Sequence, residues 1–238
     1  MIDWRSAQAR LAAAGYSTGP IDGIRGMRTL RALLDFSARR PLNGDGDERA
    51  TVALAQYDGF GMTEPARLAE FLAQVTHETG DFTRNVENLN YTSAAQILAT
   101  WPSRFRDIDD AARFVRNPIA LANRVYARPN EGNTEPGDGW KYRGRGDLEI
   151  TFKNGYALMG QAIGRDLVSD PDLAAQPGLS HRIALECWRR FKVNDWIDRG
   201  DFYAARALTN CGSPHPASKP IGLDDVASRR ARLLFVLE

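Results

Sequence analysis

The apolar positions of this 238-residue chain recur at helical spacing along most of its length. After residue 62, four of them follow the i, i+3, i+4, i+7 pattern of an amphipathic helix: Leu68, Phe71, Leu72 and Val75. Pro65 suits the first turn of this helix, and Thr63 is its expected N-cap. Strand-like alternation is nearly absent, so the pattern predicts a mainly α-helical fold. Further helices are predicted at residues 93–99, 109–115, 118–126, 152–163, 179–195, 201–208 and 224–236.

The first 58 residues form a unit of their own in the pattern. Apolar residues three and four apart predict one helix that ends at Gly15 and a second that ends before Pro41. A short third helix is predicted around Thr51 to Gln56, and segments rich in Gly, Pro and Asp separate the three. We therefore predict a three-helix domain over residues 1–58 and a larger helical domain over residues 59–238.

Composition and charge argue against several classes of function. The chain has 31 Lys and Arg against 30 Asp and Glu and no basic block, which argues against binding to a nucleic-acid backbone. No apolar stretch approaches the roughly 20 residues of a membrane span, so no membrane insertion is expected. Residues 1–4 do not begin a Sec signal peptide. Cys187 and Cys211 can form at most one bridge, and two buried free thiols are favoured.

Two glutamates are the first candidates for chemistry. Glu78 continues the apolar stripe just before Gly80, where partial burial would favour the protonated form of a carboxyl group, as a general acid requires. Glu87 follows nine positions later in a polar segment and can serve as the base. An inverting hydrolysis needs about 6.5–9.5 Å between two such carboxyl groups. Spacing alone leaves open that Glu78 is an ordinary helix-end residue in solvent.

Six ordered segments give a more specific signal. They begin at His77-Glu78-Thr79-Gly80 and continue with residues 87–91, 101–105, 122–126, 137–146 and 209–210. In this order they resemble glycoside hydrolase family 19, and most of all its bacteriophage-type endolysins, the chitinase-like lysozymes. The resemblance implies a lysozyme-like, two-lobed helical catalytic domain that cuts β-1,4 bonds of amino-sugar polymers with inversion and needs no metal or other cofactor.

The resemblance also assigns catalytic roles residue by residue. Glu78 matches the family's general acid, and Glu87 matches the general base that activates water. Thr151 matches the hydroxyl residue that holds this water, because a hydroxyl group both donates and accepts hydrogen bonds. Its alternative role is the N-cap of the helix at residues 152–163.

Other segments contain residues that we expect to bind the substrate. Aromatic residues can stack on sugar faces, although each is also a candidate for the core. Arg145 can pair with a carboxylate of the site or of the substrate, or form a structural ion pair. Glu149 departs from the family, which has Gln there, and puts the sugar contacts in question. The expected substrate-binding residues are Tyr91, Trp101, Asn123, Trp140, Tyr142, Arg145, Glu149 and Asn210.

The N-terminal unit resembles a second family. The segment Gly19-Pro20-Ile21-Asp22-Gly23, between helices with matching positions, is similar to the peptidoglycan-binding three-helix repeat. Its structural alternative is a tight turn that any such bundle needs. A DNA-binding helix-turn-helix is disfavoured by the long connection and by Asp35 on the second helix.

These features together predict an endolysin that hydrolyses the bond between N-acetylmuramic acid and N-acetylglucosamine. The expected partner is the peptidoglycan glycan strand. The expected setting is a monomer in the host cytoplasm that depends on a holin for release. The alternatives are a chitinase and a catalytically decayed wall-binding protein. A zinc peptidase fails because residue 81 is Asp, so His77-Glu78 does not extend to His-Glu-x-x-His.

Overall fold

The computed structural model describes all 238 residues and consists of helices joined by loops. The α-helices are α1 (Trp4–Ala13), α2 (Met27–Ala38), α3 (Gly44–Gln56), α4 (Pro65–Glu78), α5 (Ala94–Thr100), α6 (Ile108–Ala112), α7 (Pro118–Val125), α8 (Asp138–Lys141), α9 (Lys153–Ile163), α10 (Pro177–Arg190), α11 (Val193–Ile197), α12 (Phe202–Cys211) and α13 (Leu223–Leu237). The 3-10 helices are η1 (Asp58–Phe60), η2 (Pro129–Glu131) and η3 (Pro171–Ala175). The prediction of a mainly helical fold is confirmed.

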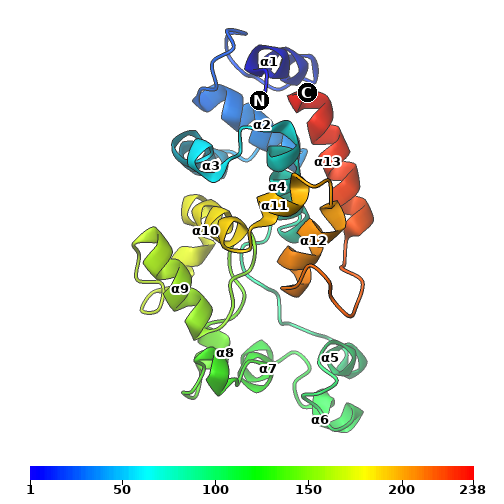
Figure 1. The fold of residues 1–238 in the computed structure, drawn as a ribbon. Coiled ribbons are helices and arrows are strands. Elements are labelled where there is room, and N and C mark those ends of the chain that lie inside the picture. Colours follow the sequence, from blue (N-terminus) through cyan, green and yellow to red (C-terminus); the bar gives the residue numbers. More distant parts are fainter.

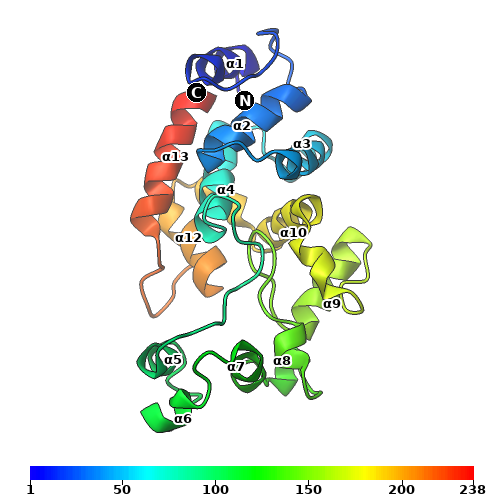
Figure 2. The same ribbon diagram turned by 180° about the vertical axis from the view of Figure 1, so that it is seen from behind.

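The helices form two lobes of unequal size. Figures 1 and 2 show α1–α4 and α10–α13 gathered at one end of the molecule, whereas α5–α8 lie at the other end. Each end has its own apolar core, and a third cluster around Tyr156 and Met159 joins α9 to α10. None of the helices is both long and apolar enough to cross a bilayer.

Helix α4 is the central element of the large lobe. Its residues from Leu68 to Thr76 are all buried, because α2, α11 and α13 pack around it. The one carboxylate in this stretch, Glu70, accepts a hydrogen bond from Arg230 of α13 at 2.9 Å. Burial raises the pKa of Glu70, so the contact with Arg230 offsets part of the cost of placing an acidic group here.

The helices of residues 1–58 share the core of the large lobe. Leu11, Leu33 and Ala50 belong to the same buried cluster as Phe71 of α4 and Val236 of α13. The Nη1 atom of Arg10 also donates to the carbonyl of Phe235, 3.0 Å away. The three predicted helices are therefore present as α1, α2 and α3. The boundary at residue 58 stays a prediction, since apolar packing continues across it.

Several predicted details of the helices are wrong. The N-cap of α4 is Glu64 instead of Thr63, with Pro65 at the first position. Helix α3 begins at Gly44, because the acidic residues of this segment lie in a helical first turn, where they complement the helix dipole, instead of in a loop. The run at residues 179–195 divides into α10 and α11 at Lys192, which has a φ of 52°. Both cysteines are free, but Cys211 is exposed.

The shared core predicts that residues 1–58 unfold together with the rest of the chain. Leu33→Ala removes a side chain that is 1% exposed, and we expect it to cost about 2–5 kcal/mol. Thermal unfolding of this variant, followed by circular dichroism and tryptophan fluorescence, should show one transition at a lower temperature. Leu54→Ala, at an exposed position of α3, is the control with little effect. Two transitions, of which only one moves, would contradict the prediction.

Candidate active site

Glu78 ends α4 at the junction of the two lobes. The chain turns after it because Gly80 adopts a φ of 56°, in the left-handed region that glycine tolerates. The Oε1 atom of Glu78 accepts a hydrogen bond from Arg206 of α12, whose side chain is almost fully buried. Arg206 is itself fixed by donating from Nε to the carbonyl of Ile221 at 2.8 Å. The buried Arg206 side chain therefore fixes the position of the Glu78 carboxyl group.

Glu87 lies between α4 and α5 in the chain. Figure 1 shows that this connection runs from the large lobe to the small lobe. Its backbone N–H donates to the Gly144 carbonyl at 3.0 Å, and the Gly144 N–H donates to its Oε1 atom at 2.5 Å. The hydroxyl of Tyr126 donates to Oε2 at 2.7 Å. Burial, followed by the charge of Glu87, raises the pKa of Tyr126, so the phenol keeps the proton that it donates. Both carboxylate oxygens are thus oriented by donors, as a general base requires.

Residues 144–151 form a loop that connects Glu87 to the other predicted site residues. The backbone of Arg145 forms one antiparallel β-bridge with Val86 and another with Ile150. At the end of this loop Thr151 donates from its hydroxyl to the Glu149 carbonyl at 3.1 Å, which leaves the oxygen lone pairs of Thr151 free to accept from a water. The N-cap of α9 is Phe152, so the N-cap role considered for Thr151 is not the one it has.

Glu149 shares the electrostatic environment of the two predicted catalytic glutamates. It has a φ of 45°, uncommon for a residue with a side chain. The residue as a whole is exposed, but it lines a pocket wall that shields part of its surface from water. Burial of the carboxylate, followed by the negative charges of Glu87 and Glu78, raises the pKa of Glu149 from 4.5 to about 7. The three carboxylates therefore lie within electrostatic range of one another at the junction of the lobes.

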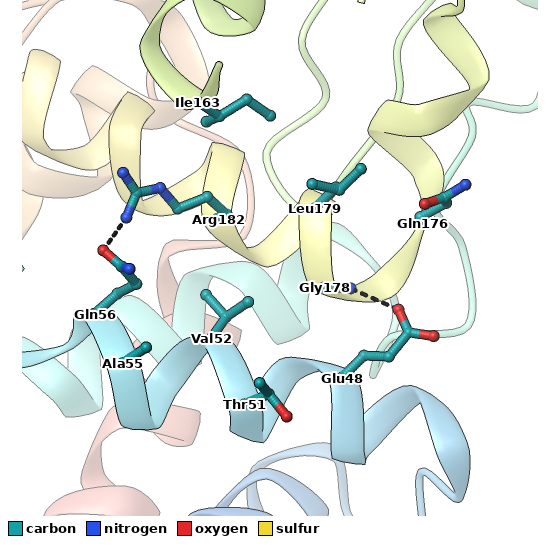
Figure 3. Close-up of a pocket in the computed structure, with 10 residues that line it drawn as sticks. All are labelled: Glu48, Thr51, Val52, Ala55, Gln56, Ile163, Gln176, Gly178, Leu179 and Arg182. Atoms are coloured by element: carbon teal, nitrogen blue, oxygen red, sulfur yellow. Dashed lines mark hydrogen bonds between the residues drawn. The ribbon is translucent and has the colours of Figure 1, made fainter. Parts of the chain in front are cut away.

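A pocket of about 300 Å³ adjoins this group of residues. Glu149, Thr151 and Thr209 contribute polar atoms to its wall, and Leu158 and Phe191 contribute apolar surface. A larger cavity of about 560 Å³ lies elsewhere, between α3 and α10, where the Gly178 N–H donates to Glu48 (Figure 3). None of the predicted site residues lines this larger cavity.

Most of the predicted aromatic and amide residues lie in the small lobe. Tyr91 and Trp101 pack edge to face with their ring centroids 5.3 Å apart. Asn123 accepts a hydrogen bond from the Trp140 backbone at 2.8 Å, and the Arg143 guanidinium covers the Trp140 ring at 3.8 Å. These four predicted residues are only partly buried, so their use in substrate binding stays a prediction.

Two of the expected substrate contacts are corrected by the structure. Tyr142 is 1% exposed, and its hydroxyl donates to the Val168 carbonyl, so its ring belongs to the core and offers no face to a sugar. Arg145 is 2% exposed and pairs with Asp172 at 2.7 Å. It also donates to Tyr156 at 2.8 Å. Arg145 therefore has the structural role that the sequence left open as its alternative.

Asn210, another predicted substrate-binding residue, has a backbone partner near Arg206. Its side-chain oxygen accepts from the Ile221 N–H at 2.9 Å, next to the carbonyl that holds Arg206. Arg206 and Tyr126 are not among the site residues predicted from the sequence. Tyr126 is the last residue of the family-like segment 122–126, and Arg206 lies one helical turn before the predicted site residue Asn210.

Comparison with known proteins agrees with this geometry. The family model of class I chitinases, glycoside hydrolase family 19, matches residues 49–195. A glycosyl hydrolase family 19 domain-containing protein of Haemophilus influenzae is 40% identical over 140 residues, which cover 58% of this chain and 69% of that protein. The chain belongs to glycoside hydrolase family 19.

Other members of family 19 resemble the chain over different lengths. An endochitinase of Pisum sativum is 30% identical over 148 residues, 60% of this chain but only 40% of that protein. Chitinase C of Streptomyces griseus has the same fold, with a TM-score of 0.58 at 17% identity over 94% of this chain and 77% of that one. The lysozyme-like helical fold and a glycosidase activity of the family 19 type are thereby established.

Tyr126→Phe tests the environment of Glu87 in this family 19 enzyme. The variant lacks one hydrogen bond to a charged group, worth about 1.5–3 kcal/mol, so kcat/KM should fall about ten-fold or more. Loss of a donor to the carboxylate also disfavours its ionised form, and the acidic limb of the pH–rate profile should move to higher pH. Tyr203→Phe, at an exposed position, is the matched control. An unchanged profile would contradict the role of Tyr126.

Glu149→Gln tests the third carboxylate through stability. Between pH 4.5 and about 7 the folded protein retains a proton on Glu149 that the unfolded chain has released. Stability is therefore lost as pH rises through this window, and the loss is complete above pH 7. The melting temperature of Glu149→Gln should exceed that of the wild type at pH 8, and the difference should vanish toward pH 4.5. Glu135→Gln is the exposed control, and a pH-independent difference would argue against the shifted pKa.

Proposed function

We propose that the protein is an endolysin that hydrolyses the β-1,4 bond between N-acetylmuramic acid and N-acetylglucosamine in peptidoglycan. The choice of substrate is supported by the combination of a family 19 domain with an N-terminal three-helix unit that has a pocket of its own. We further propose that it acts as a monomer that waits in the host cytoplasm and reaches the wall through a holin.

In the proposed mechanism Glu78 gives its proton to the glycosidic oxygen as the bond breaks. Glu87 takes a proton from a water molecule, and that water attacks the anomeric carbon from the opposite face with inversion. The two donors on Glu87, Tyr126 and the Gly144 N–H, suit a carboxylate that acts as a base. Thr151 is the proposed second contact for the water.

The pocket of the N-terminal unit supports binding to the cell wall. It has a volume of about 190 Å³ and is bordered by Pro20 and Asp22 of the Gly-Pro-Ile-Asp-Gly turn and by Arg28 of α2. The buried amide of Gln8 holds this turn by donating to Asp22 at 3.1 Å and to the carbonyl of Ile24 at 3.0 Å. A preformed turn with both charges at its rim can bind a polar, zwitterionic fragment of peptidoglycan.

Chitin is the second candidate substrate. It is favoured by the names of the relatives, since the Pisum sativum protein is an endochitinase and the Streptomyces griseus structure is a chitinase. Both substrates present β-1,4-linked N-acetylated sugars to the same acid and base. They differ in the lactyl group and peptide that muramic acid carries, so the products of digestion distinguish them.

Glu78→Gln and Glu87→Gln test the proposed function directly. Each variant should lower the lysis rate of outer-membrane-permeabilised cells by about 100-fold or more, since each removes a positioned proton donor or acceptor. Both should still sediment with purified cell walls, because the N-terminal pocket is intact. Glu131→Gln is the control that keeps full activity.

Mass spectrometry of the digested wall decides between the candidates. Fragments with reducing-end muramic acid support the muramidase, whereas hydrolysis of chitin oligomers without any muropeptide supports the chitinase. Wall binding without hydrolysis of either polymer would support a decayed enzyme. Undiminished lysis by both glutamine variants would refute the acid and base assignments.

A further inference from the structure

Asp147 is a charged residue without any access to solvent. Its Oδ1 atom accepts from the Arg49 guanidinium at 2.9 Å and from the Ser180 hydroxyl at 2.5 Å. Its Oδ2 atom lies 3.0 Å from Nδ1 of His181. Burial alone would raise the pKa of Asp147, but the charge of Arg49 and the hydrogen bonds from His181 and Ser180 lower it to about 2. The group is therefore an anion that depends on its partners.

The protonation of the neighbouring groups follows from this anion. Burial lowers the pKa of His181, so the ring is neutral at pH 7. Because the carboxylate of Asp147 only accepts, the single ring proton of His181 is on Nδ1. Nε2 must then accept, and it lies 2.9 Å from the hydroxyl of Tyr57, which donates. Arg49 is thus the one full positive charge that faces Asp147.

The position of Asp147 in the chain connects this network to the active site. Asp147 lies between Gly144, which donates to Glu87, and the residues Glu149 and Thr151 of the same loop. The loop closes on itself through two hydrogen bonds between Arg145 and Ile150, at 3.2 and 2.9 Å. Because the closed loop is short, the anchor at Asp147 determines where both of its ends lie.

Arg49 also contacts the segment that leads to Glu87. Its Nη2 atom lies 3.4 Å from Oδ1 of Asn85, two residues before Glu87, and its guanidinium covers the ring of Phe82 at 4.4 Å. The Gly146 N–H in turn donates to the Asn85 carbonyl at 2.8 Å. One guanidinium from α3 therefore contacts both the segment that carries the predicted base and the loop that carries its backbone donor, the Gly144 N–H.

We propose that Arg49 is a positioning residue for catalysis, which places the Glu87 segment and the 144–151 loop relative to each other through Asn85 and Asp147. The inference rests on the role of Glu87 in the proposed function. It makes α3, the last helix of the N-terminal unit, a working part of the active site in addition to any wall binding by the turn at residues 19–23.

The test measures kcat, KM and melting temperature of the full chain on the soluble glycan that the wild type hydrolyses, either solubilised peptidoglycan or glycol chitin. Arg49→Met should lower kcat by about 10- to 100-fold, because a displacement of about 1 Å in a catalytic group has effects of this size. KM should stay within about three-fold, since Arg49 does not touch the substrate. Arg49→Lys keeps the charge opposite Asp147 and should recover part of kcat.

A double variant separates positioning from stability. Arg49→Met leaves a buried anion without its cation, whereas Arg49→Met combined with Asp147→Asn removes both charges and should regain much of the melting temperature. The loop is still not anchored to α3, so kcat should stay low, and the acidic limb of the pH–rate profile should lie at higher pH because the Gly144 donor to Glu87 is displaced.

The controls keep the inference separate from the proposed function. Arg25→Met removes an arginine that pairs with the exposed Asp58 in the same unit, and it should leave kcat unchanged. Wild-type kcat in Arg49→Met or in the double variant, or a kcat that recovers in step with the melting temperature, would overturn the inference. If Glu78→Gln and Glu87→Gln are inactive in that case, the proposed function still stands.

Discussion

The structure depends on how one buried carboxylate is neutralised. Asp147 has no contact with water, and an isolated anion there would cost several kcal/mol. Arg49 of α3 supplies the compensating charge and His181 of α10 donates a hydrogen bond, so two helices that are far apart in the chain meet at the same loop. The Asp147 network therefore links α3, α10 and the 144–151 loop through one buried charge, in addition to the apolar packing between the two helices.

The three carboxyl groups near the predicted site also differ in the hydrogen-bond partners that surround them. Glu78 faces a buried guanidinium, Glu87 accepts from a phenol and a backbone amide, and Glu149 has no hydrogen-bonded cation. Desolvation and the negative charges of Glu87 and Glu78 raise the pKa of Glu149 to about 7. Glu149 occupies the position at which the resemblance to the family predicts a Gln, whose amide does not ionise. A Glu at this position thus adds a titratable group near the predicted acid and base.

Much of the fold was predictable because helical periodicity and caps are local properties. The stripe on α4 and the helix at residues 118–126 needed no tertiary information. The start of α3 was missed because Asp and Gly indicate a turn by composition, whereas here the acidic residues stabilise a helix N-terminus. Among the site residues, Tyr142 and Arg145 were misassigned because a motif states which residues occur but not which way they point. Arg206 is separated from Glu78 by 128 residues, and only the packing of α12 beside α4 brings them together.

The N-terminal unit combines two properties that are usually considered alternatives. Its turn at residues 19–23 borders a pocket on one side, as a binding module would, while Arg49 of α3 and Tyr57 just after it contact Asp147 and His181. The match to the family model begins at residue 49, inside α3, so the family's own segment already includes this helix. Removal of residues 1–58 would therefore take away a part of the catalytic domain together with the turn. A change in wall affinity after such a deletion would not identify the turn as the binding site, whereas substitutions confined to Asp22 and Arg28 leave α3 intact and separate the two properties.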